Sequence, residues 1–238
     1  MSPRPFRMIV MTVFVQVFVS GLMPQAQALG ANTPYPSMAR FEQYLITDRE
    51  AEIAMARSAA PKSISDGAGV MVLGREGYTI AAKGTNGFLC MVERSWGAST
   101  DAPDFWNPRV RAPICFNPAA ARTFVPIYLM KTKLVLAGKS KIQIVQLTAL
   151  AMDHKELLAL ESGAMCYMMS QQQYLSDDDM GWHPHLMFFV SGEAAKSWGA
   201  NLPGSPVMAA NDPEERVTIF LLSVGKWSNG MPDSPRAH

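Results

Sequence analysis

The side chains best suited to chemistry lie in residues 182–187, Trp-His-Pro-His-Leu-Met. Residues two apart on a strand point to the same face, so a strand that begins by His183 would carry His183, His185 and Met187 on one side. Two imidazoles and a thioether suit copper, and imidazoles joined by a carboxylate from the aspartate run just upstream suit zinc. The stretch lacks His-x-x-x-His or Cys-x-x-Cys spacing, and Pro184 favours a loop or a strand edge. A histidine pair with a purely structural role is therefore the alternative to a zinc or copper site.

Nucleophilic catalysis has two candidates. Cys166 and His185 would form a thiolate–imidazole pair if their strands are neighbours. A catalytic thiol needs an electropositive and partly open setting, whereas Cys166 lies in an apolar run, 164–169. Ser205 lies in a proline- and glycine-rich turn, 202–206, without the Gly-x-Ser-x-Gly pattern of a nucleophile elbow. A Cys- or Ser-dependent hydrolase stays an alternative, and the sequence leans against an enzyme.

Four tryptophans in loop-like segments offer a different function. They are Trp96, Trp106, Trp182 and Trp198, interleaved with proline and asparagine. Exposed aromatic side chains on loops over a rigid sheet commonly form a recognition surface. The alternative is that these side chains close the ends of the core. We expect a binding or interaction module without catalytic machinery, and the sequence identifies neither its ligand nor its partner.

Residues 1–28 read as a secretory signal peptide. Arg4 and Arg7 supply the positive start, residues 8–23 are almost wholly apolar, and Ala-Gln-Ala precedes the predicted cleavage after Ala28. The apolar run is shorter and more interrupted than a membrane-spanning helix, which needs about 20 apolar residues. We expect a periplasmic or secreted protein with no membrane span after cleavage.

Cleavage also changes the charge of the chain. The full sequence has 21 basic and 20 acidic residues, and the leader contains two of the basic residues, Arg4 and Arg7, and none of the acidic ones. The mature chain would therefore carry 19 basic and 20 acidic residues, a net charge of −1. Nucleic-acid binding requires a concentrated basic surface, so this balance argues against a nucleic-acid partner.

Three cysteines follow the leader, and an oxidising compartment favours their pairing. We expect the bridge Cys90–Cys115, because these two residues flank one tryptophan- and proline-rich excursion, 95–113. Such a bridge stabilises a fold by about 3 kcal/mol in the chain-entropy description. Cys166 would then be a free, buried thiol.

The first half of the mature chain predicts one helix and then strands. Apolar residues recur at helical spacing over 37–59. Short apolar or alternating runs at 70–73, 78–82 and 88–94 are separated by glycine-rich turns, the second of which contains Asn-Gly. These turn signals predict a three-stranded antiparallel meander.

The second half predicts helices and then strands again. Asn117 caps a helix that Pro118 opens and Pro126 interrupts, and Ser140 with Gln143 has the spacing of a capping box. Three further strands are expected, at 164–170, 185–190 and 217–224. The order of strands, helices and strands predicts an α+β fold with a mainly antiparallel sheet and three or four helices. We expect a single domain over 29–238, with loose ends at 29–36 and 229–238.

Three stretches resemble segments of uncharacterised exported bacterial proteins. They are residues 105–108 (Phe-Trp-Asn-Pro), 115–118 (Cys-Phe-Asn-Pro) and 182–189. The resemblance extends over most of the chain after the leader. It implies no activity, ligand or catalytic residue.

Overall fold

The computed structural model describes residues 34–177 and 182–233. These residues belong to one compact unit, Asn32–His238. The predicted signal peptide, 1–28, lies outside the described residues. None of the helices in the described ranges combines the length and the apolar composition that a membrane span requires.

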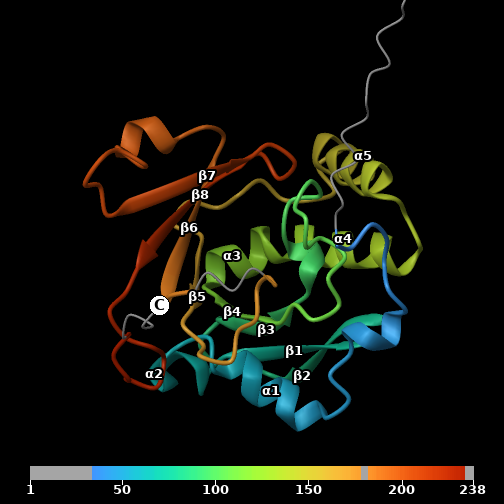
Figure 1. The fold of residues 1–238 in the computed structure, drawn as a ribbon, viewed down its shortest axis with the longest axis horizontal. Coiled ribbons are helices and arrows are strands. Elements are labelled where there is room, and N and C mark those ends of the chain that lie inside the picture. Colours follow the sequence, from blue (N-terminus) through green and yellow to red (C-terminus); the bar gives the residue numbers. More distant parts are fainter. Residues whose placement is uncertain (1–33, 178–181, 234–238) are drawn as a thin grey trace, which may run out of the picture. The chain divides into compact units, whose positions relative to one another are not determined.

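Eight strands form one sheet in the order β2-β1-β3-β4-β5-β6-β8-β7 (Figure 1). Every neighbouring pair is antiparallel except β1 and β3, which are parallel. The prediction of an α+β fold with a mainly antiparallel sheet is therefore confirmed. The strands are β1 (Gly69–Gly74), β2 (Gly77–Ala82), β3 (Leu89–Glu93), β4 (Ala112–Phe116), β5 (Met165–Met168), β6 (His185–Ser191), β7 (Val207–Asp212) and β8 (Val217–Ser223).

The predicted three-stranded meander is wrong at its third strand. The β1–β2 hairpin forms, but β3 pairs with β1 rather than with β2. The reason is a close crossing: a Cβ added at Gly84 would lie 2.2 Å from the backbone N of Gly69, so only glycine fits there. The N–H of Thr85 donates to the carbonyl of Gly67 at 2.8 Å. The segment after β2 thus passes across the start of β1 and places β3 on the far side.

The described residues form five α-helices, more than the three or four predicted: α1 (Arg49–Arg57), α2 (Lys62–Ser65), α3 (Pro118–Thr123), α4 (Val125–Leu136) and α5 (Lys141–Asp153). The predicted helix 37–59 divides into a short 3-10 helix, Phe41–Tyr44, and α1. Asp48 causes the division, because its carboxylate accepts the backbone N–H groups of Glu50 and Ala51 and begins α1 there. The caps at Asn117 and Ser140 form as predicted, and Pro126 lies in the first turn of α4.

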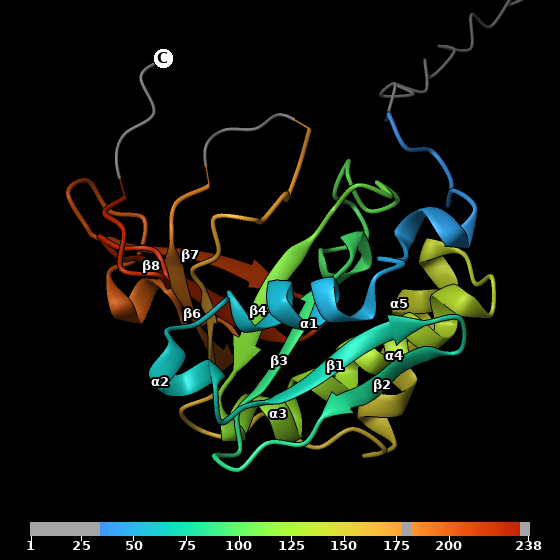
Figure 2. The same ribbon diagram turned by 90° about the horizontal axis from the view of Figure 1, so that it is seen from below.

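Helices cover both faces of the part of the sheet formed by β1 to β5. Figure 2 shows α1 across one face of β1, β3 and β4, with α3 and α4 on the opposite side. Alternation along β3 divides its side chains between two cores: Val92 belongs to the α1 side and Met91 to the larger core under α3 and α4. The predicted disulfide is confirmed, because Cys90 and Cys115 are bonded where β3 and β4 pair, and Cys166 is a buried free thiol.

Two strands, β4 and β7, lie in segments for which the sequence predicted no strand. The strand β4 was not predicted because it contains Pro113, which cannot donate a backbone hydrogen bond. The proline is tolerated because β5 pairs with β4 only at Cys115 and Phe116. The other, β7, forms one edge of the sheet. The Asn201 side chain pairs with the outer backbone groups of this strand. Its amide N–H donates to the carbonyl of Ala209 at 2.8 Å, and its amide oxygen accepts the Ala209 N–H at 3.0 Å.

Candidate functional site

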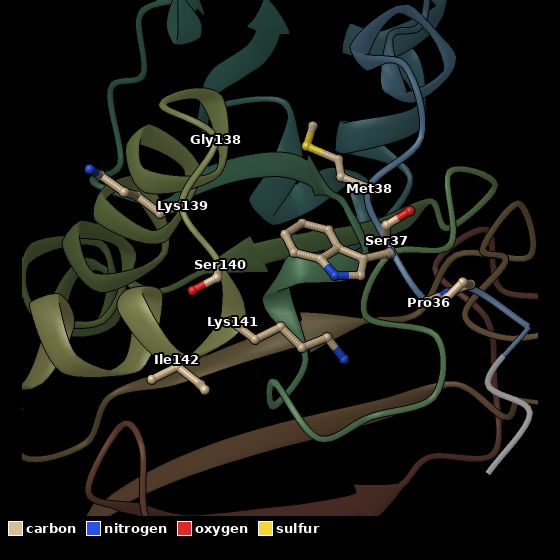
Figure 3. A pocket seen from close by; sticks show the side chains of 9 residues that line it. Pro36, Ser37, Met38, Gly138, Lys139, Ser140, Lys141 and Ile142 are labelled. Carbon is tan, nitrogen blue, oxygen red and sulfur yellow. The ribbon is translucent and has the colours of Figure 1, made fainter. Parts of the chain in front are cut away.

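A groove of about 540 Å³ lies beside the N-terminus of α5 (Figure 3). One side is made by residues 36–38, which precede the first 3-10 helix, and the other by the junction between α4 and α5. The lining residues are Pro36, Ser37, Met38, Trp106, Gly138, Lys139, Ser140, Lys141 and Ile142. The groove is therefore built from three segments that are far apart in the sequence.

The start of α5 fixes the polar side of the groove. The hydroxyl of Ser140 accepts the N–H of Gln143 at 3.3 Å, and the Gln143 side chain accepts the Ser140 N–H at 3.0 Å, which completes a capping box. Gly138, with φ +68°, lets the chain turn sharply from α4 into this cap. The positively polarised end of a 13-residue helix consequently opens beside the groove.

Lys141 supplies a positive charge to the groove. Its side chain reaches across toward residues 36–37, whereas the Lys139 side chain points away from them (Figure 3). The Lys141 ammonium lies 4.9 Å from the centroid of the Phe105 ring, within the range of a cation–π interaction. Partial burial lowers the pKa of Lys141 because it disfavours the charged form. An anion that entered the groove would replace part of this lost hydration.

Apolar side chains supply the rest of the groove wall. Trp106 is only 6% exposed and packs edge-on against Phe105, with ring centroids 4.6 Å apart. Its carbonyl accepts the Tyr44 hydroxyl at 2.8 Å, which ties the segment to the core. Ile142, on the helix side, is 69% exposed. A rigid aromatic wall thus faces an exposed aliphatic side chain, an arrangement that suits the apolar body of a ligand.

The two histidines proposed as metal ligands occupy different environments. His185 begins β6, is buried, and contacts the carbonyl of His183 through Nδ1 at 2.8 Å; burial lowers its pKa. His183 is exposed, and its Nδ1 lies 2.6 Å from Oδ2 of Asp233. Among the described side chains, no group of three His, Cys, Asp or Glu residues could hold a metal ion. Asp177, one of the acids considered for zinc, instead contacts Tyr35, Asn107, Arg109 and Tyr174, and residues 178–179 lie outside the described ranges.

The thiol proposed as a nucleophile lies on the strand next to His185, as the hydrolase hypothesis requires. Cys166 in β5 pairs with Met187 in β6, two residues from His185. Burial raises the pKa of the Cys166 thiol well above its ordinary value, and the charge of Glu93 raises it further. The group is therefore a neutral thiol at physiological pH, and it is completely buried.

The four tryptophans divide into two pairs. Trp96 and Trp106 are buried, and the Trp96 indole N–H donates to the Thr132 hydroxyl at 3.0 Å. Both rings pack in the main core, and Trp106 also forms part of the groove wall, so neither is an exposed loop side chain of the kind the sequence predicted. Trp182 and Trp198 are 41% and 49% exposed. Only the second pair is available for recognition in the way the sequence predicted.

Sequence reasoning missed the role of Lys141 and Met38. The sequence pattern assigns no function to Lys141, and Met38 lies in the predicted helix 37–59. The capping box could have indicated this part of the site, because it places the positive end of α5 at Ser140. Comparison of the chain with protein-family models, with curated proteins and with solved structures gave no match.

Proposed function

We propose that this is a non-enzymatic binding protein, and that the groove beside α5 takes a small ligand in which an anionic group is joined to an apolar body. The observation that carries the proposal is the position of Lys141, whose side chain spans the groove at the positive end of α5 (Figure 3). A ligand of this class matches both halves of the wall.

The polar half favours an anion for two reasons. The first turn of any α-helix has backbone N–H groups without partners in the helix, and they point toward the space before it. Lys141 adds an ammonium charge at the same place, which the carboxylates of Asp101 and Glu214 offset in part. Hydrogen bonds in which one partner is charged contribute roughly 1.5–3 kcal/mol, which corresponds to about a tenfold or larger gain in affinity.

The apolar half favours a flexible or flat hydrocarbon body. Met38 offers an adaptable thioether on one side, and Ile142 offers a branched aliphatic group on the other. The buried Trp106 holds its position through packing rather than through the ligand. A ligand would therefore bind to a largely formed wall, at low cost in ordering the protein.

The disulfide supports a location outside the cytoplasm. Bonds of this kind persist in oxidising compartments, and Cys90–Cys115 joins two central strands. We accordingly infer that the protein works in the periplasm or outside the cell, with the predicted leader directing its export.

The proposal is tested by titrating the mature, disulfide-bonded protein with decanoate and with 1-decanol, which differ in charge but share a chain length. Binding is measured by isothermal titration calorimetry. We expect decanoate to bind about tenfold more tightly, because only the carboxylate meets Lys141 and the helix end. Lys141→Met should remove most of this preference while decanol binding stays unchanged.

The matched control is Lys139→Met, which removes the same charge from a side chain that points away from residues 36–37 (Figure 3). It should keep most of the preference for decanoate. Equal affinities for the acid and the alcohol in the unmodified protein would contradict the proposal, and so would an equal loss in both lysine variants.

A further inference from the structure

A second polar site surrounds the carboxylate of Asp177. Its Oδ1 accepts the Tyr174 hydroxyl at 2.5 Å and the Asn107 amide at 2.7 Å, and it forms an ion pair with the Arg109 guanidinium. Its Oδ2 accepts the Tyr35 hydroxyl. Four donors from three separate segments of the chain therefore converge on one carboxylate.

Contacts that do not involve Asp177 hold these donors in place. Asn107 is fully buried. Its side-chain amide N–H also donates to Oδ1 of Asp104 at 2.8 Å, and its side-chain Oδ1 accepts the backbone N–H of Arg109 at 2.9 Å. The Arg109 guanidinium carbon lies 5.2 Å from the centroid of the Tyr174 ring. The donor set is thus prepared for a carboxylate independently of which carboxylate occupies it.

The backbone of Tyr174 is anchored in the same way. Its N–H donates to the carbonyl of Arg111 at 2.9 Å, and its carbonyl accepts the Arg111 N–H at 2.8 Å. Tyr35 lies on a different segment, directly before the groove residues 36–38. The Tyr35 side chain packs against the main core, so replacing the Asp177 side chain would leave both hydroxyl groups on segments that other contacts position.

Asp177 itself is a surface residue of a long connection between β5 and β6. Its side chain is 29% exposed, and that of Arg109 is 60% exposed, so water reaches the ion pair. Exposed ion pairs contribute little net free energy because each charge is also well hydrated. Hydrogen bonds, above all that from Tyr174, lower the pKa of Asp177 well below its usual range. The occupant is therefore a permanently charged carboxylate in a solvent-accessible site.

We propose that Tyr35, Asn107, Arg109 and Tyr174 form a binding site for the carboxylate of an external ligand, and that Asp177 occupies this site in the free protein. The planar guanidinium and the two hydroxyl groups match the two oxygens of a carboxylate. Because Asp177 is tethered, it competes at a high effective concentration, and an external acid must displace it. The site is separate from the proposed function of the groove, which uses Lys141.

The test compares the unmodified protein with Asp177→Ala by titration with sodium acetate at constant ionic strength, followed by two-dimensional NMR of the side-chain amides. Removing the competing carboxylate should increase the affinity for acetate at least tenfold, and the Asn107 amide signal should shift on binding. A short peptide with a free C-terminal carboxylate, compared with its amidated form, then distinguishes a peptide terminus from a small free acid as the source. Tighter binding of the free-acid peptide than of acetate would assign the site to peptide ends.

Asp153→Ala is the matched control. Asp153 forms an exposed ion pair of similar kind with Arg216 at 2.8 Å, without hydroxyl or amide donors among its described hydrogen bonds. Its removal should leave the affinity for acetate unchanged. Asp177→Ala with Arg109→Met should lose the gain, whereas Asp177→Ala with Lys141→Met should keep it and so separate this site from the groove.

Either of two results would overturn the proposal: a folded Asp177→Ala variant that binds acetate no better than the unmodified protein, or a gain that persists without Arg109. If Asp177→Ala does not fold, Asp177→Asn serves instead, because the amide keeps the shape of the side chain and removes its charge. A smaller gain of about threefold is then expected, and no gain would again reject the site.

Discussion

Glu52 and Asp177 are both carboxylates that pair with an arginine, but they lie in opposite environments. The Glu52 side chain in α1 is 1% exposed. Its Oε1 accepts hydrogen bonds from Nη2 of Arg94 at 2.8 Å and from the backbone N–H of Leu73 at 3.2 Å. Arg94 also donates to the carbonyls of Tyr44 and Val92, and its own side chain is fully buried. Asp177 has more side-chain donors but stays in contact with water. The number of hydrogen bonds therefore does not decide whether a carboxylate can leave its arginine. Burial decides it, because a buried charge has no water to replace the lost partner.

The alternation of side chains at the end of β3 places Arg94 beside Glu52. Glu93 and Arg94 are consecutive, so they point to opposite faces of the sheet. Arg94 meets Glu52 on the α1 side, while Glu93 lies against Gly97, where an added Cβ would approach its Oε2 to 2.8 Å. No hydrogen bond to the Glu93 carboxylate occurs in residues 34–177 and 182–233. Of these two adjacent residues, Arg94 is thus fully buried together with its partners, whereas Glu93 is only partly buried and has no described hydrogen-bond partner.

The largest effect is expected for Glu52→Ala, which leaves the Arg94 charge buried without its partner. The free energy of unfolding should fall by about 3–5 kcal/mol, measured by urea denaturation at pH 7. Glu50→Ala in the same helix turn, where the side chain is exposed, is the control and should move the midpoint far less. A loss at Glu52 no larger than that at Glu50 would mean that burial is not what makes this pair permanent.

A smaller effect is expected for Glu93→Gln, and it should depend on pH. Burial, with a further contribution from Glu215 and an opposing one from Lys131, raises the pKa of Glu93 from 4.5 to about 8. Below pH 4.5 the group is neutral in both states; between pH 4.5 and about 8 it ionises in the unfolded chain first, so stability falls as pH rises. The substitution should reduce this decline in the free energy of unfolding by about 2 kcal/mol. This is less than the free energy that corresponds to the whole pKa shift, because part of the carboxylate meets solvent. Parallel stability–pH curves for both proteins would show that Glu93 titrates normally.

The smallest effect on stability is expected for Asp177→Ala. Because the Arg109 pair is solvated, the free energy of unfolding should change by less than about 1 kcal/mol, measured by the same denaturation method. Asp177→Ala removes more side-chain hydrogen bonds than Glu52→Ala does, so a smaller loss of stability would show that burial outweighs the number of hydrogen bonds. A loss close to that of Glu52→Ala would make Asp177 a structural residue and would weaken the argument that its carboxylate can be exchanged.

Local signals explain what the sequence could predict. The Asn117 cap, the capping box at Ser140 and the strand pattern of β1 and β2 each depend on residues within a few positions, and each forms. The disulfide was predictable because Cys90 and Cys115 flank one excursion. The α+β class follows from the order of these local elements.

Long-range contacts explain what the sequence could not predict. The parallel pairing of β3 depends on the approach of Gly84 to Gly69, and nothing in either flank indicates it. The Asp177 site joins residues up to 142 positions apart, and in the sequence Asp177 is simply the first of three aspartates. The groove likewise needs Trp106 and residues 36–38 beside α5, and only the tertiary fold brings them together.

The edge strand β7 limits how copies of this chain can assemble. Strand pairing between molecules needs free backbone groups, and Asn201 already occupies those of Ala209, while its own N–H donates to the carbonyl of Val207 at 3.0 Å. Of the two outermost strands in the described sheet, β2 therefore offers the longer run of backbone groups without such partners. Two copies joined through β2 would each have used that edge, so growth would stop at a closed pair instead of continuing into a fibre.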